Sequence, residues 1–244
     1  MSFNLGLCSI SFRKNSPEEI LTAMKDAKLS VIEWGSDLHC PPEKAEEIAE
    51  LTKKYGIKCS SYGTYFRLGV TPINELENYI AAAKILGTNI LRLWCSYKNA
   101  NEHTEEEKDK LFSLCKTAAK IAEENDVILC MEYHNRSYTN TCQSALELMQ
   151  RVNSKHFLLY WQPNQFISVE ENLKAAELIA PYTVNIHVFN WKGDEKYPLA
   201  LAKDTWKSYL KLFKTEGSLL LEFMPDNQIN SLKTEALTLK ELVK

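Results

Sequence analysis

The segment VILCMEYH, residues 127–134, sets a run of apolar residues directly before a glutamate, a tyrosine and a histidine. Short apolar runs of this kind recur about every 30 residues, and longer segments with apolar positions three and four apart lie between them. The short runs are typical of buried strands, and the longer segments are typical of amphipathic helices. We therefore expect eight strands, at residues 4–10, 31–34, 57–62, 89–94, 127–133, 157–161, 183–188 and 218–223.

Capping residues mark the helices expected between these strands. Ser16, followed by a proline and two glutamates, predicts a helix to about residue 27. Gly56 and Gly87 suit the left-handed ends of helices expected at 43–55 and 72–86. Thr104 opens a further helix, to about residue 125, with a capping box. The remaining helices are expected to start at Thr141, Ser168 and Gln228 and to cover residues 206–215.

Eight units of strand and helix fit either an open doubly wound sheet or a closed barrel. Three observations favour the barrel. The chain has 244 residues, close to the usual barrel size of about 250. The number of units is eight, and no GxGxxG motif follows the first strand. We predict an α/β protein with a (β/α)8 barrel, or TIM barrel, that forms a single domain over residues 1–244.

Charge and composition narrow the class of partner. The chain carries 29 Lys and Arg against 32 Asp and Glu, so its net charge of -3 gives no reason to expect nucleic-acid or anionic-membrane binding. No apolar run approaches the roughly 20 residues of a membrane-spanning helix, and the start of the chain lacks a signal-peptide pattern. The seven cysteines are scattered without a Cys-x-x-Cys pair, which indicates reduced thiols and a cytoplasmic protein.

Polar side chains close the apolar strands at one end. Glu132 and Glu222 each end such a strand, and a buried carboxylate is costly without a cation nearby. With Gln162 and His187 they offer three oxygen donors and one nitrogen from four consecutive strands, whose carboxyl ends meet at one mouth of a barrel. This set predicts a site for divalent manganese, magnesium or zinc. Each residue alone is more often structural, so the prediction depends on the four together.

Further polar residues lie near the same strand ends. Glu33 is a candidate to contact substrate or to support the metal ligands, and pairing with Arg92 inside the barrel is an equal alternative. His134 lies two residues beyond Glu132, on the same face, and either binds ligand or has a structural role. His39, on the loop after the second strand, is either functional or an ordinary surface residue.

Three tryptophans recur beside the predicted mouth, at Trp34, Trp94 and Trp161. Their rings are candidates to stack on the apolar side of a sugar, and packing beneath the helices is the alternative. Tyr62, near the end of the third strand, joins the candidate substrate contacts.

In order and spacing, these strand ends resemble the sugar phosphate isomerase/epimerase family of xylose-isomerase-like barrels, which includes ketose 3-epimerases and hydroxypyruvate isomerase. The resemblance covers nearly the whole chain. It is carried by SISFR (9–13), IEWGSDLH (32–39), SYGTY (61–65), MEYH (131–134), YWQP (160–163), NIHVF (185–189) and LLEF (220–223).

The resemblance implies a metal ion held by Glu, Asp, His and Glu at the ends of strands five to eight. The corresponding positions are Glu132, Gln162, His187 and Glu222. Gln162 thus replaces an aspartate, and Gln165 stands where relatives place a histidine that touches substrate or a further metal. Both departures fall on the sixth strand and bear on metal affinity. The implied chemistry is proton transfer next to a carbonyl through an enediolate, with Glu132 and Glu222 as base and acid.

The expected function is metal-dependent isomerisation or epimerisation of a sugar or sugar phosphate, in carbohydrate metabolism. The partner is then a small molecule, and because related barrels often pair through helical faces, a homo-oligomer is one expected assembly. The candidate substrate contacts are Glu33, Trp34, His39, Tyr62, Arg92, Trp94, His134, Trp161, Gln165 and Lys192.

Two other functions remain open at this stage. The first is a non-catalytic carbohydrate-binding barrel in which Gln162 marks a lost metal site. The second, which is less favoured, is an endonuclease of the abasic-site repair type. Such a nuclease needs a histidine-rich zinc cluster and a basic surface, and this chain has five histidines and a negative net charge.

Overall fold

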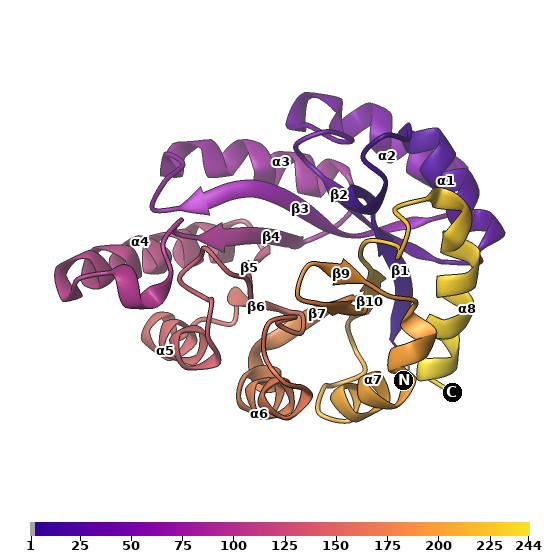
Figure 1. The fold of residues 1–244 in the computed structure, drawn as a ribbon. Helices are drawn as coiled ribbons and strands as arrows, with labels where there is room; N and C mark the ends of the chain where they lie inside the picture. The colour runs from indigo at the N-terminus through magenta and orange to yellow at the C-terminus, as the bar shows by residue number, and fades with distance from the viewer. Residues whose placement is uncertain (1–2) are drawn as a thin grey trace.

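Eight parallel strands close into a barrel in the computed structural model, which describes residues 3–244 (Figure 1). The order around the barrel is β1-β10-β7-β6-β5-β4-β3-β2, so each strand pairs with its neighbours in sequence and the first pairs with the last. The predicted fold class is confirmed. The strands are β1 (Asn4–Cys8), β2 (Val31–Gly35), β3 (Lys58–Leu68), β4 (Ile90–Cys95), β5 (Ile128–Glu132), β6 (Phe157–Trp161), β7 (Thr183–Val188) and β10 (Ser218–Leu221).

The eight strands lie where the apolar runs predict them, and the largest difference is at β3. This strand continues to Leu68, six residues beyond the predicted end, because its pairing with β4 resumes at Arg67 and Leu68 after an irregularity. β1 ends two residues early, since a short 3-10 helix covers Ser9–Phe12. β10 ends at Leu221, one residue before Glu222.

The helices cover the outside of the barrel, as Figure 1 shows. The capping box predicted at Thr104 is present, and the capping serine predicted at Ser16 also forms a capping box, with Glu19. Thr141 and Ser168 also cap their helices as predicted. The helices are α1 (Pro17–Asp26), α2 (Ala45–Lys54), α3 (Leu76–Ile85), α4 (Glu105–Glu124), α5 (Cys142–Val152), α6 (Val169–Ile179), α7 (Lys203–Leu210) and α8 (Leu232–Leu242).

Four helix starts differ from the prediction. The segments after Pro41, Pro72 and Gln228 begin as short 3-10 helices before α2, α3 and α8. α7 begins at Lys203 and ends at Leu210, whereas residues 206–215 were expected to be helical. A two-stranded antiparallel hairpin, β8 (Trp191–Lys192) with β9 (Glu195–Lys196), follows β7 and was not predicted, because strands of two residues leave no periodic pattern.

A small apolar cluster lies apart from the main core between strands and helices. It consists of Val31, Cys130, Tyr160 and Leu220, which come from β2, β5, β6 and β10. Such layers of side chains fill the interior of a (β/α)8 barrel, so ionisable groups at the carboxyl ends of the strands rest on a packed floor. No helix among residues 3–244 is long and apolar enough to cross a membrane.

Candidate active site

The four side chains expected to hold a metal ion meet around one ring nitrogen. His187 Nδ1 lies 3.2 Å from Gln162 Oε1, 3.4 Å from Glu222 Oε2 and 3.7 Å from Glu132 Oε1. Glu132 and His187 belong to the ends of β5 and β7, while Gln162 and Glu222 directly follow β6 and β10. Residues far apart in the sequence are therefore brought to one mouth of the barrel by the parallel strands.

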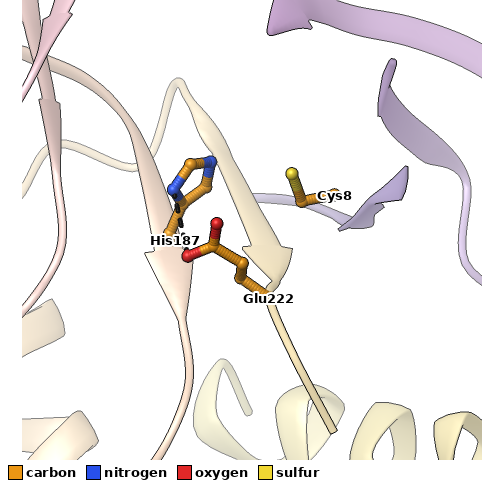
Figure 2. A group of neighbouring side chains, drawn as sticks. All are labelled: Cys8, His187 and Glu222. Atoms are coloured by element: carbon orange, nitrogen blue, oxygen red, sulfur yellow. Dashed lines mark ion pairs between the residues drawn. The ribbon is translucent and has the colours of Figure 1, made fainter. Parts of the chain in front are cut away.

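The Nε2 side of the same imidazole faces side chains of the first two strands, β1 and β2. Figure 2 shows the contact from His187 to Glu222, with the side chain of Cys8, on β1, near the same ring. Donor atoms of Cys8, His187 and Glu222 lie within 4.8 Å of one another. The Cys8 thiol donates a hydrogen bond to Glu33 Oε1 at 3.3 Å, and His187 Nε2 lies 3.4 Å from that oxygen.

Arg92 joins the two halves of this interior. Its Nε donates to Glu33 Oε1 at 3.0 Å and its Nη1 donates to Glu132 Oε2 at 2.7 Å, and the guanidinium is almost entirely buried. Trp94 Nε1 donates to the same Glu132 oxygen. The alternative in which Glu33 pairs with Arg92 inside the barrel is thus the arrangement observed.

These contacts set the protonation of the buried groups. Burial alone would raise the pKa of Glu132, but Arg92, His187 and His134 together outweigh it and hold the pKa well below its ordinary value. The pKa of Glu33 is also lowered, since Arg92 and His187 outweigh its burial. Burial and the nearby Glu132 raise the pKa of Glu222, although His187 opposes them. Glu132 and Glu222 therefore sit in opposite electrostatic environments.

Burial would lower the pKa of His187, but the carboxylates of Glu222 and Glu33 raise it well above its ordinary value. The Cys8 thiol behaves in the opposite way to a reactive cysteine. Burial and the charge of Glu33 raise its pKa to about 12, so it stays protonated at neutral pH.

A cavity of about 190 Å³ opens above these groups. Glu132, Glu222, Gln162 and Arg92 provide its polar lining, and an aromatic wall surrounds them. A second cavity, of about 310 Å³, adjoins it over the loops after β5 and β6, and half of its lining residues have amide side chains. His134, Gln162 and Gln165 line both cavities.

The structure does not bring every candidate substrate contact to this cavity. Trp34 is fully buried and donates to Thr52 Oγ1 beneath α2, and Trp161 packs against Trp206 and Tyr209 of α7. The tryptophans of β2 and β6 thus follow the alternative of packing under the helices. The candidates that line the cavity are Arg92, Trp94, His134 and Gln165.

The remaining candidates have other partners. Tyr62 points to the outside of the barrel, where its hydroxyl donates to Cys40 O. His39 is buried in its loop, with its ring nitrogens 3.2 Å from Ser9 Oγ and 3.2 Å from Asn15 O. Lys192 is exposed on the β8–β9 hairpin and lines a different cavity, and Glu33 is fully buried below the lining.

Four aromatic residues of the cavity wall were not singled out from the sequence. They are Tyr65, Phe189, Trp191 and Phe223. Phe223 has a φ of 56°, a left-handed conformation that is unfavourable for a bulky side chain and marks strain next to Glu222. Its backbone N–H donates to Ser11 Oγ at 2.9 Å, which stabilises this conformation. Apart from its place beside Glu222, the sequence contains no signal for this feature.

The donor set fits a divalent cation. Two carboxylates, one amide oxygen and one imidazole nitrogen converge from four strands, and such mixed oxygen and nitrogen sets bind manganese, magnesium or zinc. The Nδ1 side of His187 faces all three oxygen donors. The set carries two negative charges, and one of the two Glu132 oxygens already accepts from Arg92 and Trp94.

Comparison with known proteins identifies the family. Residues 21–242 match the model of the family described as xylose isomerase-like TIM barrel, so the chain belongs to this family. No curated protein sequence matches the chain.

Solved structures with the same fold include enzymes of different reaction classes. The probable 3-DHS dehydratase AsbF of Bacillus anthracis is 16% identical, with a TM-score of 0.80, and the match covers 98% of this chain and 99% of AsbF. D-psicose 3-epimerase of Clostridium cellulolyticum H10, solved with D-tagatose, is 13% identical with a TM-score of 0.74 over 99% and 98% of the two chains. The IolI protein, solved with a bound zinc atom, is 17% identical with a TM-score of 0.76 over 99% and 96%. At these identities the likeness shows the fold alone.

Proposed function

We propose that this protein is a metal-dependent isomerase or epimerase of a sugar or sugar phosphate. The observation that carries the proposal is the pair of carboxylates, Glu132 and Glu222, that line one small cavity together with Gln162, around the Nδ1 atom of His187. The zinc atom in IolI and the ketose in the D-psicose 3-epimerase structure support the metal and the substrate class.

The residues that would hold the ion are Glu132, Gln162, His187 and Glu222. When bound, a divalent ion would supply Lewis-acid stabilisation of the negative charge that develops on a substrate carbonyl oxygen. Manganese, magnesium and zinc all suit this donor set. Cys8 is outside the proposed set, because its thiol donates to Glu33 Oε1, the oxygen that lies on the Nε2 side of His187 rather than on the Nδ1 side.

The two glutamates would move the proton. Glu132 is held ionised by Arg92 and therefore suits the base that removes a proton from the carbon next to the carbonyl. Glu222, whose pKa is raised, suits the acid that returns a proton on the other side. Return to the opposite face of the same carbon inverts it, as in an epimerase. Return to the neighbouring carbon, with the hydroxyl proton passing between the two oxygens of the enediolate, moves the carbonyl, as in an isomerase.

The surrounding wall would bind the substrate. Trp191 and Phe223 offer apolar surface to a sugar ring, and Arg92, His134 and Gln165 offer hydrogen bonds to its hydroxyls. The ring of Trp94 is itself covered by the guanidinium of Arg67, 3.7 Å from the ring centroid. His134 stacks on Trp94 with ring centroids 5.4 Å apart, so the two contact the same part of the substrate.

Exchange of carbon-bound protons tests the proposal directly. The metal-supplemented protein is incubated with D-fructose, D-tagatose and D-psicose, and with their phosphate esters, in D2O, and loss of carbon-bound proton signals is followed by NMR. We expect exchange with at least one ketose, and a loss of about 100-fold to 10,000-fold in Glu132→Gln and Glu222→Gln. Glu235→Gln is the matched control, because Glu235 is a buried glutamate of α8 whose carboxylate accepts from Leu199 N. Near-native exchange in either site variant would contradict the assignment.

A non-catalytic carbohydrate-binding barrel is the second candidate. It is favoured by one observation, the neutral Gln162 beside His187 Nδ1, which leaves the donor set one charge short of the family pattern. Metal analysis of protein purified without chelator separates the two. About one equivalent of metal per chain favours the enzyme, whereas none after supplementation favours the binding protein.

A further inference from the structure

A fully buried carboxylate lies beneath the proposed metal site and contacts side chains from four other strands. The carboxylate of Glu33, on β2, has no solvent exposure and does not line the cavity, so it cannot touch substrate. Its contacts are Cys8 Sγ at 3.3 Å, Ser61 Oγ at 3.1 Å, Arg92 Nε at 3.0 Å and His187 Nε2 at 3.4 Å.

The contact with His187 involves the ring nitrogen that faces away from the proposed ligands. Within residues 3–244, Nε2 is buried and has no hydrogen bond of good geometry, while Nδ1 faces Gln162, Glu132 and Glu222. A histidine that binds a cation through Nδ1 carries its proton on Nε2, and a buried N–H without an acceptor is costly. Glu33 Oε1, at 3.4 Å, is the carboxylate oxygen on that side.

We infer that Glu33 is a positioning residue that orients the metal-binding face of the site. It accepts the Nε2 proton of His187, which leaves the Nδ1 lone pair directed at the ion. Such carboxylate–histidine pairs fix the tautomer and raise the basicity of a metal-bound imidazole. The inference rests on the proposed function only in that Nδ1 binds a metal ion.

The same carboxylate also orients Glu132, through Arg92. The guanidinium donates to Glu33 with Nε and to Glu132 with Nη1, so the position of one glutamate determines the position of the other. On its second oxygen, Glu33 accepts from Ser61, whose hydroxyl in turn accepts from Tyr160 at 2.6 Å. Two of the four proposed ligands, His187 and Glu132, thus depend on one buried anion.

Glu33→Gln tests this role with a measurement that needs no substrate. Gln keeps the volume and an acceptor oxygen but removes the charge. We expect zinc affinity, measured by competition with a chelator, to fall about 10-fold to 100-fold. In the zinc-loaded protein the Nε2 proton of His187, assigned by NMR of ring-labelled histidine, should move upfield because its hydrogen bond weakens.

The control is Glu235→Gln, which removes another buried carboxylate far from the barrel interior. It should lower stability without changing zinc affinity or the His187 signal. If Glu33→Gln does not fold, Ser61→Ala removes only one donor to Glu33 and should change both readouts in the same direction by less. Unchanged zinc affinity together with an unchanged His187 signal in the folded variant would overturn the inference. Normal zinc binding without any proton exchange would instead refute the proposed function and leave the role of Glu33 standing.

Discussion

The two halves of the barrel interior carry similar ionisable side chains and use them differently. On β5 to β10, Glu132 and Glu222 line the cavity beside His187. On β2, Glu33 is fully buried below the cavity lining and is paired with Arg92 of β4. A carboxylate near the carboxyl end of a barrel strand is therefore available for chemistry only where no fixed cation neutralises it completely. Glu132 belongs to both halves, because one oxygen accepts from Arg92 and the other faces His187.

Removal of Arg92 should have the largest effect, because it breaks the pairing that distinguishes the two halves. Arg92→Met leaves Glu33 and Glu132 buried without their cation. We expect the free energy of unfolding to fall by about 3–5 kcal/mol, measured by urea denaturation. Arg151→Met, which breaks an exposed ion pair with Asp109, is the control and should change stability little. Equal effects of the two variants would mean that the buried pair has no special importance.

Acid should weaken the ion pairs of Arg92 with Glu33 and Glu132 in the wild-type protein, from which a chelator has removed any bound metal. The pKa values of Glu33 and Glu132 are lower in the folded than in the unfolded chain, so their stabilisation is complete above the unfolded value of about 4.3. It is lost as the pH falls below that value toward the folded pKa values. Glu222, whose pKa is raised, acts in the opposite direction. Urea denaturation between pH 3 and 7 should show this loss, and the slope should flatten in Arg92→Met.

Gln162→Asp changes the charge of the ligand set at the cavity. The substitution adds a third negative charge to the ligand set around His187. Since the charge of the ligands helps to set metal affinity, we expect manganese to bind about tenfold more tightly, by isothermal titration calorimetry. Gln165→Asp, on the same loop but without a contact to His187, should not reproduce the gain. Weaker binding in Gln162→Asp would show that Gln162 lies outside the ligand set.

Cys8 provides the smallest expected effect. Its thiol contacts Glu33, in the half of the interior where Glu33 pairs with Arg92, and has a pKa of about 12. Its sulfur also lies near His187 and Glu222. Cys8→Ser should leave manganese affinity unchanged, and iodoacetamide should not modify Cys8 in the native protein, by peptide mass spectrometry. A clear loss of affinity in Cys8→Ser would move this residue into the ligand set.

Most of the fold follows from local sequence, and part of the site does too. The apolar runs and the caps at Ser16 and Thr104 depend only on nearby residues, so strands and helices were predicted within a few positions. Residues that share one mouth of a barrel, such as Glu132 and His187, follow from the parallel topology. Pairing is different, because the contacts of Arg92 with both Glu33 and Glu132 depend on distances that no sequence pattern encodes.

The sequence does contain a signal for the direction of each tryptophan, which is the alternation of side chains along a strand. Successive residues of a strand point to opposite faces, so an inward Glu33 requires an outward Trp34, and an inward Arg92 allows an inward Trp94. Applied strictly, this alternation separates Trp94, which lines the cavity, from Trp34, which packs under α2. The strained backbone at Phe223 has no comparable signal, because its hydrogen bond joins it to Ser11, which lies 212 residues earlier in the chain.

Gly63, on β3, limits how the interior of this barrel can change. A methyl group added there would lie 2.6 Å from Glu33 Oε1 and 2.9 Å from Arg92 Nη2, so the ion pair occupies the space that any larger residue would need. The absence of a side chain at position 63 and the Glu33–Arg92 ion pair therefore require each other in this structure. A Gly63→Ala chain should regain its fold only with a compensating second substitution that shortens the Glu33 or Arg92 side chain, and a suppressor screen from Gly63→Ala should return those two positions first.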